Sequence, residues 1–183
     1  MASVTVEVSE FGGLVMSREP SLIRELRMLL NSQRVAALGT LGDDGSPFVS
    51  MVPYAIERTL GCLVIHVSAL AAHTRYLRSQ ARVSLLICEP EQSGQPVHDL
   101  HRVTLSGQAR ILVKTNPYWQ ACKSAYLVRF PDAAFMIKLG DFQFFAIDIA
   151  LGRHVSGFGA ARSVDHDEIR NLLRADVPPE AAP

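Results

Sequence analysis

The chain has 183 residues, a mass of 20.1 kDa, and 18 basic and 18 acidic residues, so its formal net charge is zero. This length fits one domain that buries a core without disulfides or structural metals. A nucleic-acid-binding protein usually has a basic excess or stripe, and this sequence has neither, so we expect no nucleic-acid partner.

The N-terminal region begins without a clear period, and we expect residues 1–18 to form an arm. Pro20 follows, and proline is tolerated in the first turn of a helix because its missing amide is not needed there. Apolar residues then recur at helical spacing, at Leu22, Ile23, Leu26, Leu29 and Leu30. The sequence predicts an amphipathic helix that packs on the core.

Two stretches rich in β-forming residues flank the turn cluster Asp43-Asp44-Gly45-Ser46. Because Gly45 can adopt a positive φ, we predict a β-hairpin here. A further strand is expected at residues 60–67, a helix after Ser68, and another strand at residues 82–90.

The second half of the chain predicts more strands than helices. Residues 91–99 have the composition of a loop, and residues 101–112 alternate as a strand does. Asn116 and Pro117 begin a helix that carries Trp119, and residues 141–159 supply the last strands. The proline-rich residues 174–183 are expected to be disordered.

Strands joined by short antiparallel turns, with few helices between them, favour a mainly β (α+β) fold. We expect a small β-barrel with helices across its openings. A doubly wound parallel sheet is disfavoured because helices do not alternate regularly with the strands. Neither GxGxxG nor GxxxxGK[ST] occurs, so dinucleotide and P-loop phosphate sites have no support.

The three cysteines, Cys62, Cys88 and Cys122, are far apart, and no CxxC or HExxH motif occurs. We therefore expect no metal site. The sequence starts without a signal-peptide pattern and contains no apolar run long enough for a bilayer. A cytoplasmic protein without membrane association is expected.

The corner between the strand at 60–67 and the following helix gathers polar side chains. Ser68 is a residue type favoured at helix N-caps, and a helix N-terminus offers free amides and partial positive charge to an anion. His73, Thr74 and Arg75 follow within one turn, and they could add hydrogen bonds and charge. The pattern fits a phosphate site, or simply a helix with a polar face.

Three other positions leave two interpretations open. Arg102 begins a strand, where its guanidinium can point into a barrel mouth or lie exposed on the surface. Pro53 indicates an edge or a bulge, and free edge amides could bind a flat ring rich in acceptors. Gly157 and Gly159 permit close backbone approach, or form a simple turn.

Five stretches of the chain, taken in order, resemble FMN-binding split-barrel proteins related to pyridoxamine 5′-phosphate oxidase. They are RVAALGTLGDDGSPFVSMVPYAI, SALAAHTRYLRSQARVSLLI, RVTLSGQARIL, GDFQFFAID and VSGFGAA. The resemblance covers about residues 20 to 165 and is closest to the haem-utilisation branch. It implies a six-stranded antiparallel split β-barrel with flanking helices, which assembles as a homodimer with FMN at the interface.

The resemblance also implies domain limits and a site. Residues 19–165 would form the FMN-binding domain, and residues 166–183 a short C-terminal helix and disordered tail. In the family, the strand-to-helix corner binds the flavin phosphate, one strand runs along the isoalloxazine, and a polar position lies beside it. The implied cofactor-binding residues are Ser50, Met51, Val52, Pro53, Ser68, His73, Thr74, Arg75 and Arg102. No catalytic residue is placed.

The chain also departs from the family pattern. Ala55 stands where pyridoxamine phosphate oxidases have a lysine, and the adjacent Arg153 and His154 do not form their Arg-x-His motif. Haem-binding members use a histidine beyond the GFG segment, where this chain has His166. Asp141 matches an acidic position of that branch.

These observations predict an FMN-dependent flavoprotein, an oxidoreductase acting on a small-molecule substrate. The first alternative is a haem-binding or haem-utilisation protein that uses the same dimer cleft, with His166 or His154 as the iron ligand. The second alternative is a non-catalytic module that binds a cofactor.

Overall fold

The structure, a computed structural model, describes residues 21–157 and 160–175. The strands are β1 (Val35–Leu41), β2 (Pro47–Pro53), β3 (Ala55–Glu57), β4 (Cys62–Ser68), β5 (Arg82–Cys88), β6 (Arg102–Leu112), β7 (Phe142–Val155) and β8 (Ala161–Asp165). The α-helices are α1 (Ser21–Ser32), α2 (Ala72–Ser79), α3 (Trp119–Arg129) and α4 (His166–Arg174). Two 3₁₀ helices, η1 (Val97–Asp99) and η2 (Pro131–Lys138), complete the described elements.

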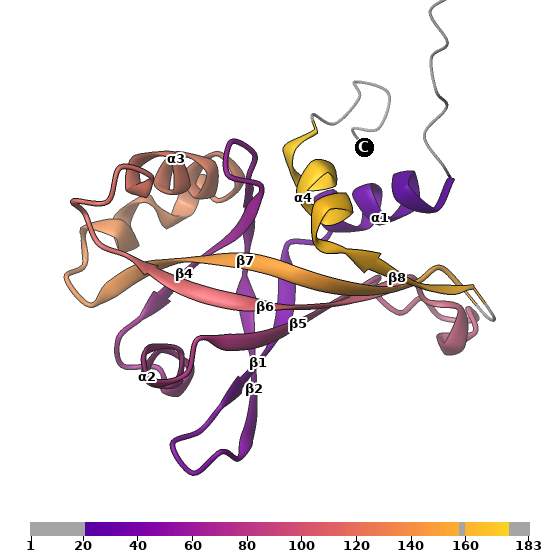
Figure 1. Cartoon of the computed structure of the whole chain (residues 1–183), viewed down its shortest axis with the longest axis horizontal. Helices are drawn as coiled ribbons and strands as arrows, with labels where there is room; N and C mark the ends of the chain where they lie inside the picture. The colour runs from indigo at the N-terminus through magenta and orange to yellow at the C-terminus, as the bar shows by residue number, and fades with distance from the viewer. Residues whose placement is uncertain (1–20, 158–159, 176–183) are drawn as a thin grey trace, which may run out of the picture.

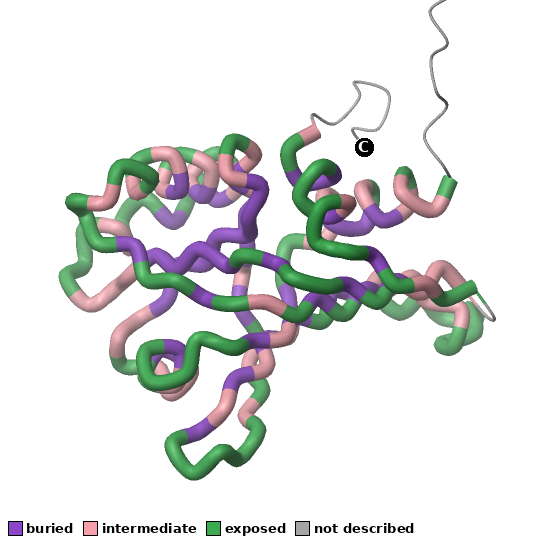
Figure 2. Tube along the Cα trace, viewed as in Figure 1, coloured by how far each residue is buried: buried purple, intermediate pink, exposed green. Residues whose placement is uncertain are grey.

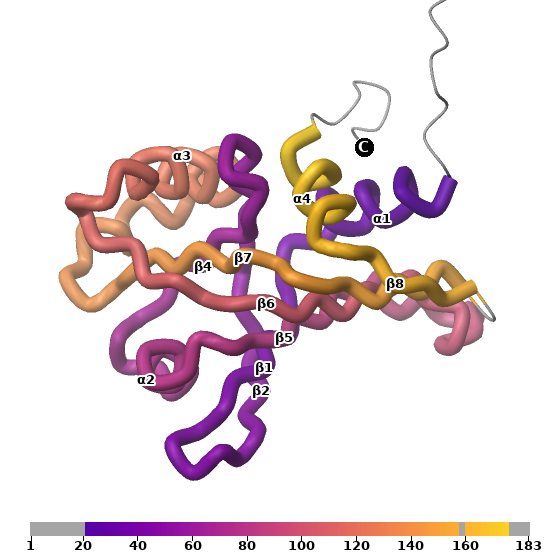
Figure 3. Tube along the Cα trace, viewed as in Figure 1, coloured from indigo at the N-terminus to yellow at the C-terminus, as the bar shows by residue number. Residues whose placement is uncertain are grey.

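The strands form one curled antiparallel sheet in the order β2-β1-β5-β6-β7-β4-β3, with β8 paired to β7 (Figure 1). The α3 helix and η2 lie at one end of the molecule, and α1 and α4 lie side by side at the other (Figures 1 and 3). The predicted mainly β fold with flanking helices is confirmed. The described sheet has eight strands rather than six because the short segments β3 and β8 also pair, with β4 and β7.

The parts of the chain outside the described residues include several predicted features. They are the arm at residues 1–18, residues 176–183 of the tail, and Phe158 and Gly159 of the glycine turn. The α4 helix begins after Asp165, whose side chain accepts a hydrogen bond from the Glu168 amide (2.9 Å). No described helix is long and apolar enough to cross a membrane.

The hairpin β1–β2 forms where the turn cluster predicts it. Gly45 has a φ of +80°, which a residue with a side chain rarely adopts, and the Asp44 carboxylate accepts hydrogen bonds from the amide and hydroxyl of Ser46. The β2 strand is the terminal strand of the sheet, so the edge position that Pro53 predicts is confirmed.

The longest ladder of the described sheet, between β6 and β7, contains a β-bulge at Gly107. Ser106 pairs with Leu151 and Gly107 with Ile149, so one residue of β7 is left over. A Cβ atom on Gly107 would lie 2.2 Å from the backbone oxygen of Asp148, so the two strands can approach this closely only at a glycine.

The larger hydrophobic core fills the inside of the curl and is closed by α1 and α4. The α1 helix contributes Leu26, Leu29 and Leu30, which confirms its predicted packing face, and α4 contributes Leu172 and Leu173. Figure 2 shows the buried positions along the central strands and on the inner sides of these helices. Burying each such leucine contributes about 1.5–3 kcal/mol.

The second core lies on the opposite face of β4 and β7, under α3 and η2. His66 belongs to this layer, is 6% exposed, and stacks on Phe144 with ring centroids 4.3 Å apart. Its Nδ1 atom is buried without a hydrogen-bond partner among the described residues. Burial lowers the pKa of His66 from 6.5 to about 4, against a smaller opposing effect of the Asp141 charge.

Two arginines join the ends of three helices. Arg58 donates hydrogen bonds to the backbone oxygens of Leu173 and Ala175 at the end of α4, and to Asn31 Oδ1 of α1 (2.9 Å). Arg129, the last residue of α3, donates to the backbone oxygen of Asn31 (2.9 Å). Helix C-termini carry unpaired carbonyls and partial negative charge, so these guanidinium groups satisfy both.

Replacing Gly107 by alanine should lower the free energy of unfolding by about 2–4 kcal/mol, because the added methyl group must push the β7 backbone away. Gly140→Ala is the matched control, since a Cβ atom there meets nothing within 4 Å. Urea unfolding followed by circular dichroism measures both. Equal stability of the two variants would show that the bulge tolerates a side chain.

The lowered pKa of His66 predicts a pH dependence of stability. As the pH falls from about 6.5 to about 4, the unfolded chain binds a proton that the folded chain does not. Burial of the neutral His66 therefore leaves the free energy of unfolding undiminished above pH 6.5. Between about pH 6.5 and pH 4 the free energy of unfolding falls by about 2–3 kcal/mol because of this residue. His66→Phe should flatten the fall in unfolding free energy between pH 7 and pH 4.5. The exposed control His98→Gln should keep the wild-type slope, and an unchanged slope in His66→Phe would contradict the prediction.

Candidate functional site

The predicted phosphate corner exists, between the end of β4 and the start of α2. Ser68, however, does not cap α2: the N-cap is Ala71, which has no side-chain capping bond. The Ser68 hydroxyl instead donates to Asp141 Oδ2 (2.7 Å) and accepts from the Leu70 amide (3.2 Å). The N-cap prediction is wrong because three residues separate Ser68 from the helix, and Asp141 approaches from the start of β7.

Thr74 is fully buried in this corner. Its hydroxyl donates to the backbone oxygen of Ser68 over 2.6 Å, so its only hydroxyl proton is already engaged. The Ala69 amide donates to the backbone oxygen of Asp141. The corner is therefore held together by its own polar groups, and an acidic side chain lies within it.

His73 faces the edge strand. Its Nδ1 atom lies 3.0 Å from Ser50 Oγ of β2, so the structure brings these two predicted site residues together. The Nε2 atom is buried without a partner among the described residues, and burial lowers the pKa of this imidazole. The Nε2 atom of a neutral His73 is therefore unpaired, but a ligand could contact it only if the side chains that cover it moved.

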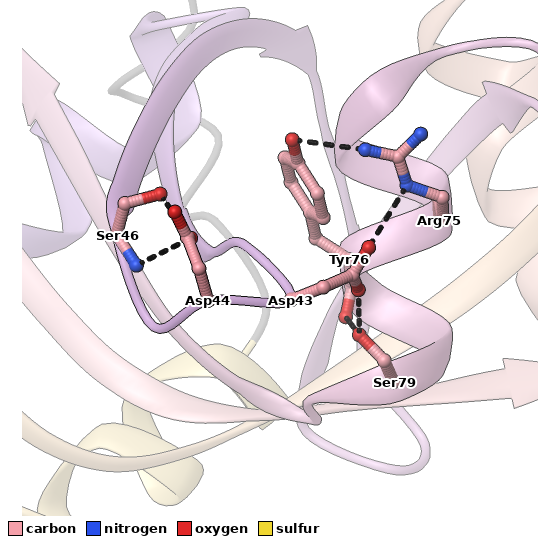
Figure 4. A network of polar contacts seen from close by, with 6 residues as sticks. All are labelled: Asp43, Asp44, Ser46, Arg75, Tyr76 and Ser79. Atoms are coloured by element: carbon pink, nitrogen blue, oxygen red, sulfur yellow. Dashed lines mark hydrogen bonds and ion pairs between the residues drawn. The ribbon is translucent and has the colours of Figure 1, made fainter.

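Arg75 points toward the β1–β2 hairpin (Figure 4). Its Nε atom lies 3.4 Å from Asp43 Oδ2, its Nη2 atom donates to the Tyr76 hydroxyl (3.1 Å), and its guanidinium lies over the Tyr76 ring. Both side chains of the ion pair are more than 60% exposed, so water screens this contact. The charge of Arg75 is thus directed to a carboxylate rather than to the corner.

The remaining predicted site residues are divided between two places. On β2, Met51 is 64% exposed, whereas the side chain of Val52 is buried in the core, so only its backbone could contact a ligand. Arg102 pairs with Cys88 at the end of β5 opposite to Arg82, the residue nearest α2, and it donates to the Leu100 backbone oxygen (2.9 Å). A single chain therefore does not bring Arg102 to the corner.

A second place of interest is a cavity of about 220 Å³ between α4, β7 and the turn before β4. It is lined by Leu60, Gly61, Asp148, Ile149, His166 and Arg170. His166 is exposed, and its Nδ1 atom donates to the Ile149 backbone oxygen over 2.7 Å. Because a carbonyl only accepts, Nδ1 carries the proton and Nε2 of the neutral ring carries the lone pair.

The cavity at His166 includes residues that the sequence reasoning missed, Asp148 and Arg170. The available signal was the spacing of His166 and Arg170, four residues apart and therefore on one face of a helix. A larger hollow of about 540 Å³ is lined by Gln33, Glu89, Pro90, Gln92, Ser93, Gly94 and Gln95. It contains no histidine or arginine, so the cavity at His166 is the better candidate for binding an anionic or metal-containing ligand.

His154, the other predicted iron ligand, is 1% exposed and lies on the inner side of β7. Its pKa is lowered, first by burial and then by the nearby His101 and Arg162 charges. An iron could reach it only if the barrel opened, so this candidate has no geometric support. The described residues contain no cluster of three or more histidine, cysteine or acidic side chains able to hold a metal ion.

Known proteins similar to this chain include haem proteins. The chloroplastic non-canonical heme oxygenase HOZ of Arabidopsis thaliana is 34% identical over 143 residues, 77% of this chain and 42% of that protein. Heme oxygenase HutZ of Vibrio cholerae is 25% identical over 153 residues, 83% of this chain and 86% of that protein. These names agree with the haem-utilisation branch that the sequence resembles.

A solved structure of a heme binding protein from Mycobacterium smegmatis superposes with a TM-score of 0.74 at 30% identity, covering 84% of this chain and 61% of that one. The chain thus spans under two thirds of both the Arabidopsis and the mycobacterial protein. Residues 22–156 match the pyridoxamine 5′-phosphate oxidase family. Since this match covers most of the chain, the protein belongs to that family.

Proposed function

We propose that this protein binds haem and that His166 is its iron ligand. The observation that carries this proposal is the His166 imidazole, whose Nδ1–H is held by the Ile149 carbonyl while Nε2 is left free beside a cavity. Metal-binding histidines commonly donate their other N–H to a carbonyl in this way, which fixes the tautomer and the ring orientation. The named relatives are haem proteins, which supports the same choice.

The contacts of the strand-to-helix corner favour haem over FMN as the principal ligand. The FMN phosphate carries up to two negative charges, and the Asp141 carboxylate already accepts the Ser68 hydroxyl there. The Thr74 hydroxyl proton is engaged with the Ser68 backbone oxygen, and Arg75 contacts Asp43 of the hairpin, although water screens that exposed ion pair. FMN remains the second candidate because His73 Nε2 is a buried nitrogen with no partner among the described residues.

Within this proposal each group of the chain has a defined task. The Ile149 carbonyl orients His166, and the neutral ring would hold the iron through Nε2. Leu60 would supply apolar contact, and Arg170 would supply positive charge. Bound haem would supply the redox and oxygen chemistry of its iron.

We also propose that two copies pair through the outer face of β2, β1 and β5. Met51 lies opposite Ala37, which lies opposite Leu86, so one row across three strands is apolar. Met51, Leu86 and the neighbouring Val49 are exposed, and a contiguous exposed apolar surface is typical of an interface. In such a dimer, Arg102 of one copy could contact a ligand at the strand-to-helix corner of the other copy, but not at its own.

Haemin titration should give a shifted Soret band and saturation at one haem per chain. His166→Ala should abolish the spectrum of a histidine-bound iron and weaken binding about 10-fold or more. His154→Gln, a change at a buried histidine, should keep that spectrum if the variant folds by circular dichroism. Normal iron coordination in His166→Ala would exclude His166 as the ligand.

A parallel FMN titration separates the two candidate ligands. Quenching of flavin fluorescence at one FMN per chain, with no uptake of haemin, would overturn the haem proposal. In that case Ser50→Ala should weaken FMN binding through the loss of its contact with His73.

Met51→Asp should convert the proposed dimer to a monomer, because it places a charge in the middle of an apolar contact. Size-exclusion chromatography with light scattering gives the mass directly. Val128→Asp is the control, since Val128 is 83% exposed on α3, away from the β2–β1–β5 face. A wild-type chain that is monomeric at high concentration would contradict the pairing.

A further inference from the structure

Three basic side chains lie along one face of α4. His166, Arg170 and Arg174 are spaced by four residues, so they follow one another along the helix. Arg170 and Arg174 are exposed, and neither has an ion pair or hydrogen bond with another described residue. The acidic side chain of the same helix that does form an ion pair, Glu168, is bound to Arg162 of β8.

The turn before β4 packs directly against the stems of these arginines. Gly61 has a φ of +71°, and a Cβ atom there would lie 3.0 Å from Arg170 Cγ and 3.1 Å from Arg174 Cγ. The glycine therefore lets the turn approach α4 so closely that the aliphatic stems cover it. Of these two arginines, Arg170 lines the cavity beside His166, and the packing of its stem against the turn restricts where its guanidinium group can lie.

We infer that Arg170, with Arg174 behind it, binds a carboxylate of the ligand whose iron His166 coordinates, that is, a haem propionate. This inference rests on the proposed function. A rise of 1.5 Å per residue places Arg170 about 6 Å along α4 from His166, so one ligand could contact both. The planar guanidinium is suited to a carboxylate because it can donate two parallel hydrogen bonds.

Asp148 also lines this cavity and would repel a carboxylate. Its Oδ2 atom lies 3.5 Å from Arg110 Nη2, which offsets part of its charge, although both side chains are about half exposed. The Glu57 carboxylate next to the cavity accepts hydrogen bonds from the Thr59 and Leu60 amides, whereas Arg170 has no ion pair with another described residue. The guanidinium group of Arg170 is therefore available at this cavity for an anionic group of a ligand.

The test compares haemin with its dimethyl ester, in which both propionates are neutral. Arg170→Gln should weaken haemin binding about 10-fold and leave binding of the dimethyl ester unchanged, because only the ionised ligand offers a charge-assisted hydrogen bond. Arg174→Gln should have a smaller effect in the same direction. The control Arg24→Gln, at an exposed arginine of α1, should bind both ligands as the wild type does.

The outcomes separate this inference from the proposed function. No haemin binding by the wild type would overturn the proposed function itself. Tight haemin binding that is equal in Arg170→Gln and the wild type would overturn only the propionate contact. An equal loss for haemin and dimethyl ester would also overturn it, because a general packing defect does not distinguish the two ligands. The Soret spectrum of bound haemin should stay that of a histidine-bound iron in Arg170→Gln.

Discussion

The close approach of β6 and β7 at Gly107 is the constraint on which much of this structure depends. With no side chain at Gly107, the β7 backbone can pass it and form a bulge. The Ile149 carbonyl next to the bulge accepts the His166 imidazole, which anchors the first turn of α4 to the sheet. The same contact orients the imidazole of His166, which we propose as the iron ligand.

The helices are held in place by two different kinds of interaction. Leucines of α1 and α4 close the larger core through burial, which is strong but not directional. Arg58 and Arg129 add directional hydrogen bonds to the carbonyl ends of α4 and α1. Burial of the leucines thus stabilises the packing of the helices. The hydrogen bonds of the two arginines determine where the helix ends lie around the turn that carries Gly61.

The strand-to-helix corner satisfies most of its polar side chains with other groups of the protein. The polar residues that resemble a phosphate site are present, but Ser68 and Thr74 hydrogen-bond within the corner and Asp141 adds a negative charge. Donors that are already engaged contribute less to the binding of an anion than unpaired donors do, and in this corner the unpaired ring nitrogen of His73 is buried. The cavity at His166 is lined by Arg170, which has no ion pair with another described residue, and so offers an anionic ligand more.

Local features of the sequence were sufficient to predict the hairpin at Gly45, the buried leucines of α1 and the antiparallel strands. Each of these features depends on residues close together in the chain. The hairpin depends on a turn glycine, the α1 helix on the helical spacing of its leucines, and the strands on the alternation of apolar and polar residues. Contacts between distant residues decided the rest. Asp141 meets Ser68 across 73 positions, Arg102 and the α2 corner lie at opposite ends of β5, and His166 finds its carbonyl acceptor 17 residues away. The periodicity of the sequence does not show which distant polar groups meet, because these contacts depend on the register and curl of the sheet. Only the tertiary structure therefore determined which side chains remain free to bind a ligand.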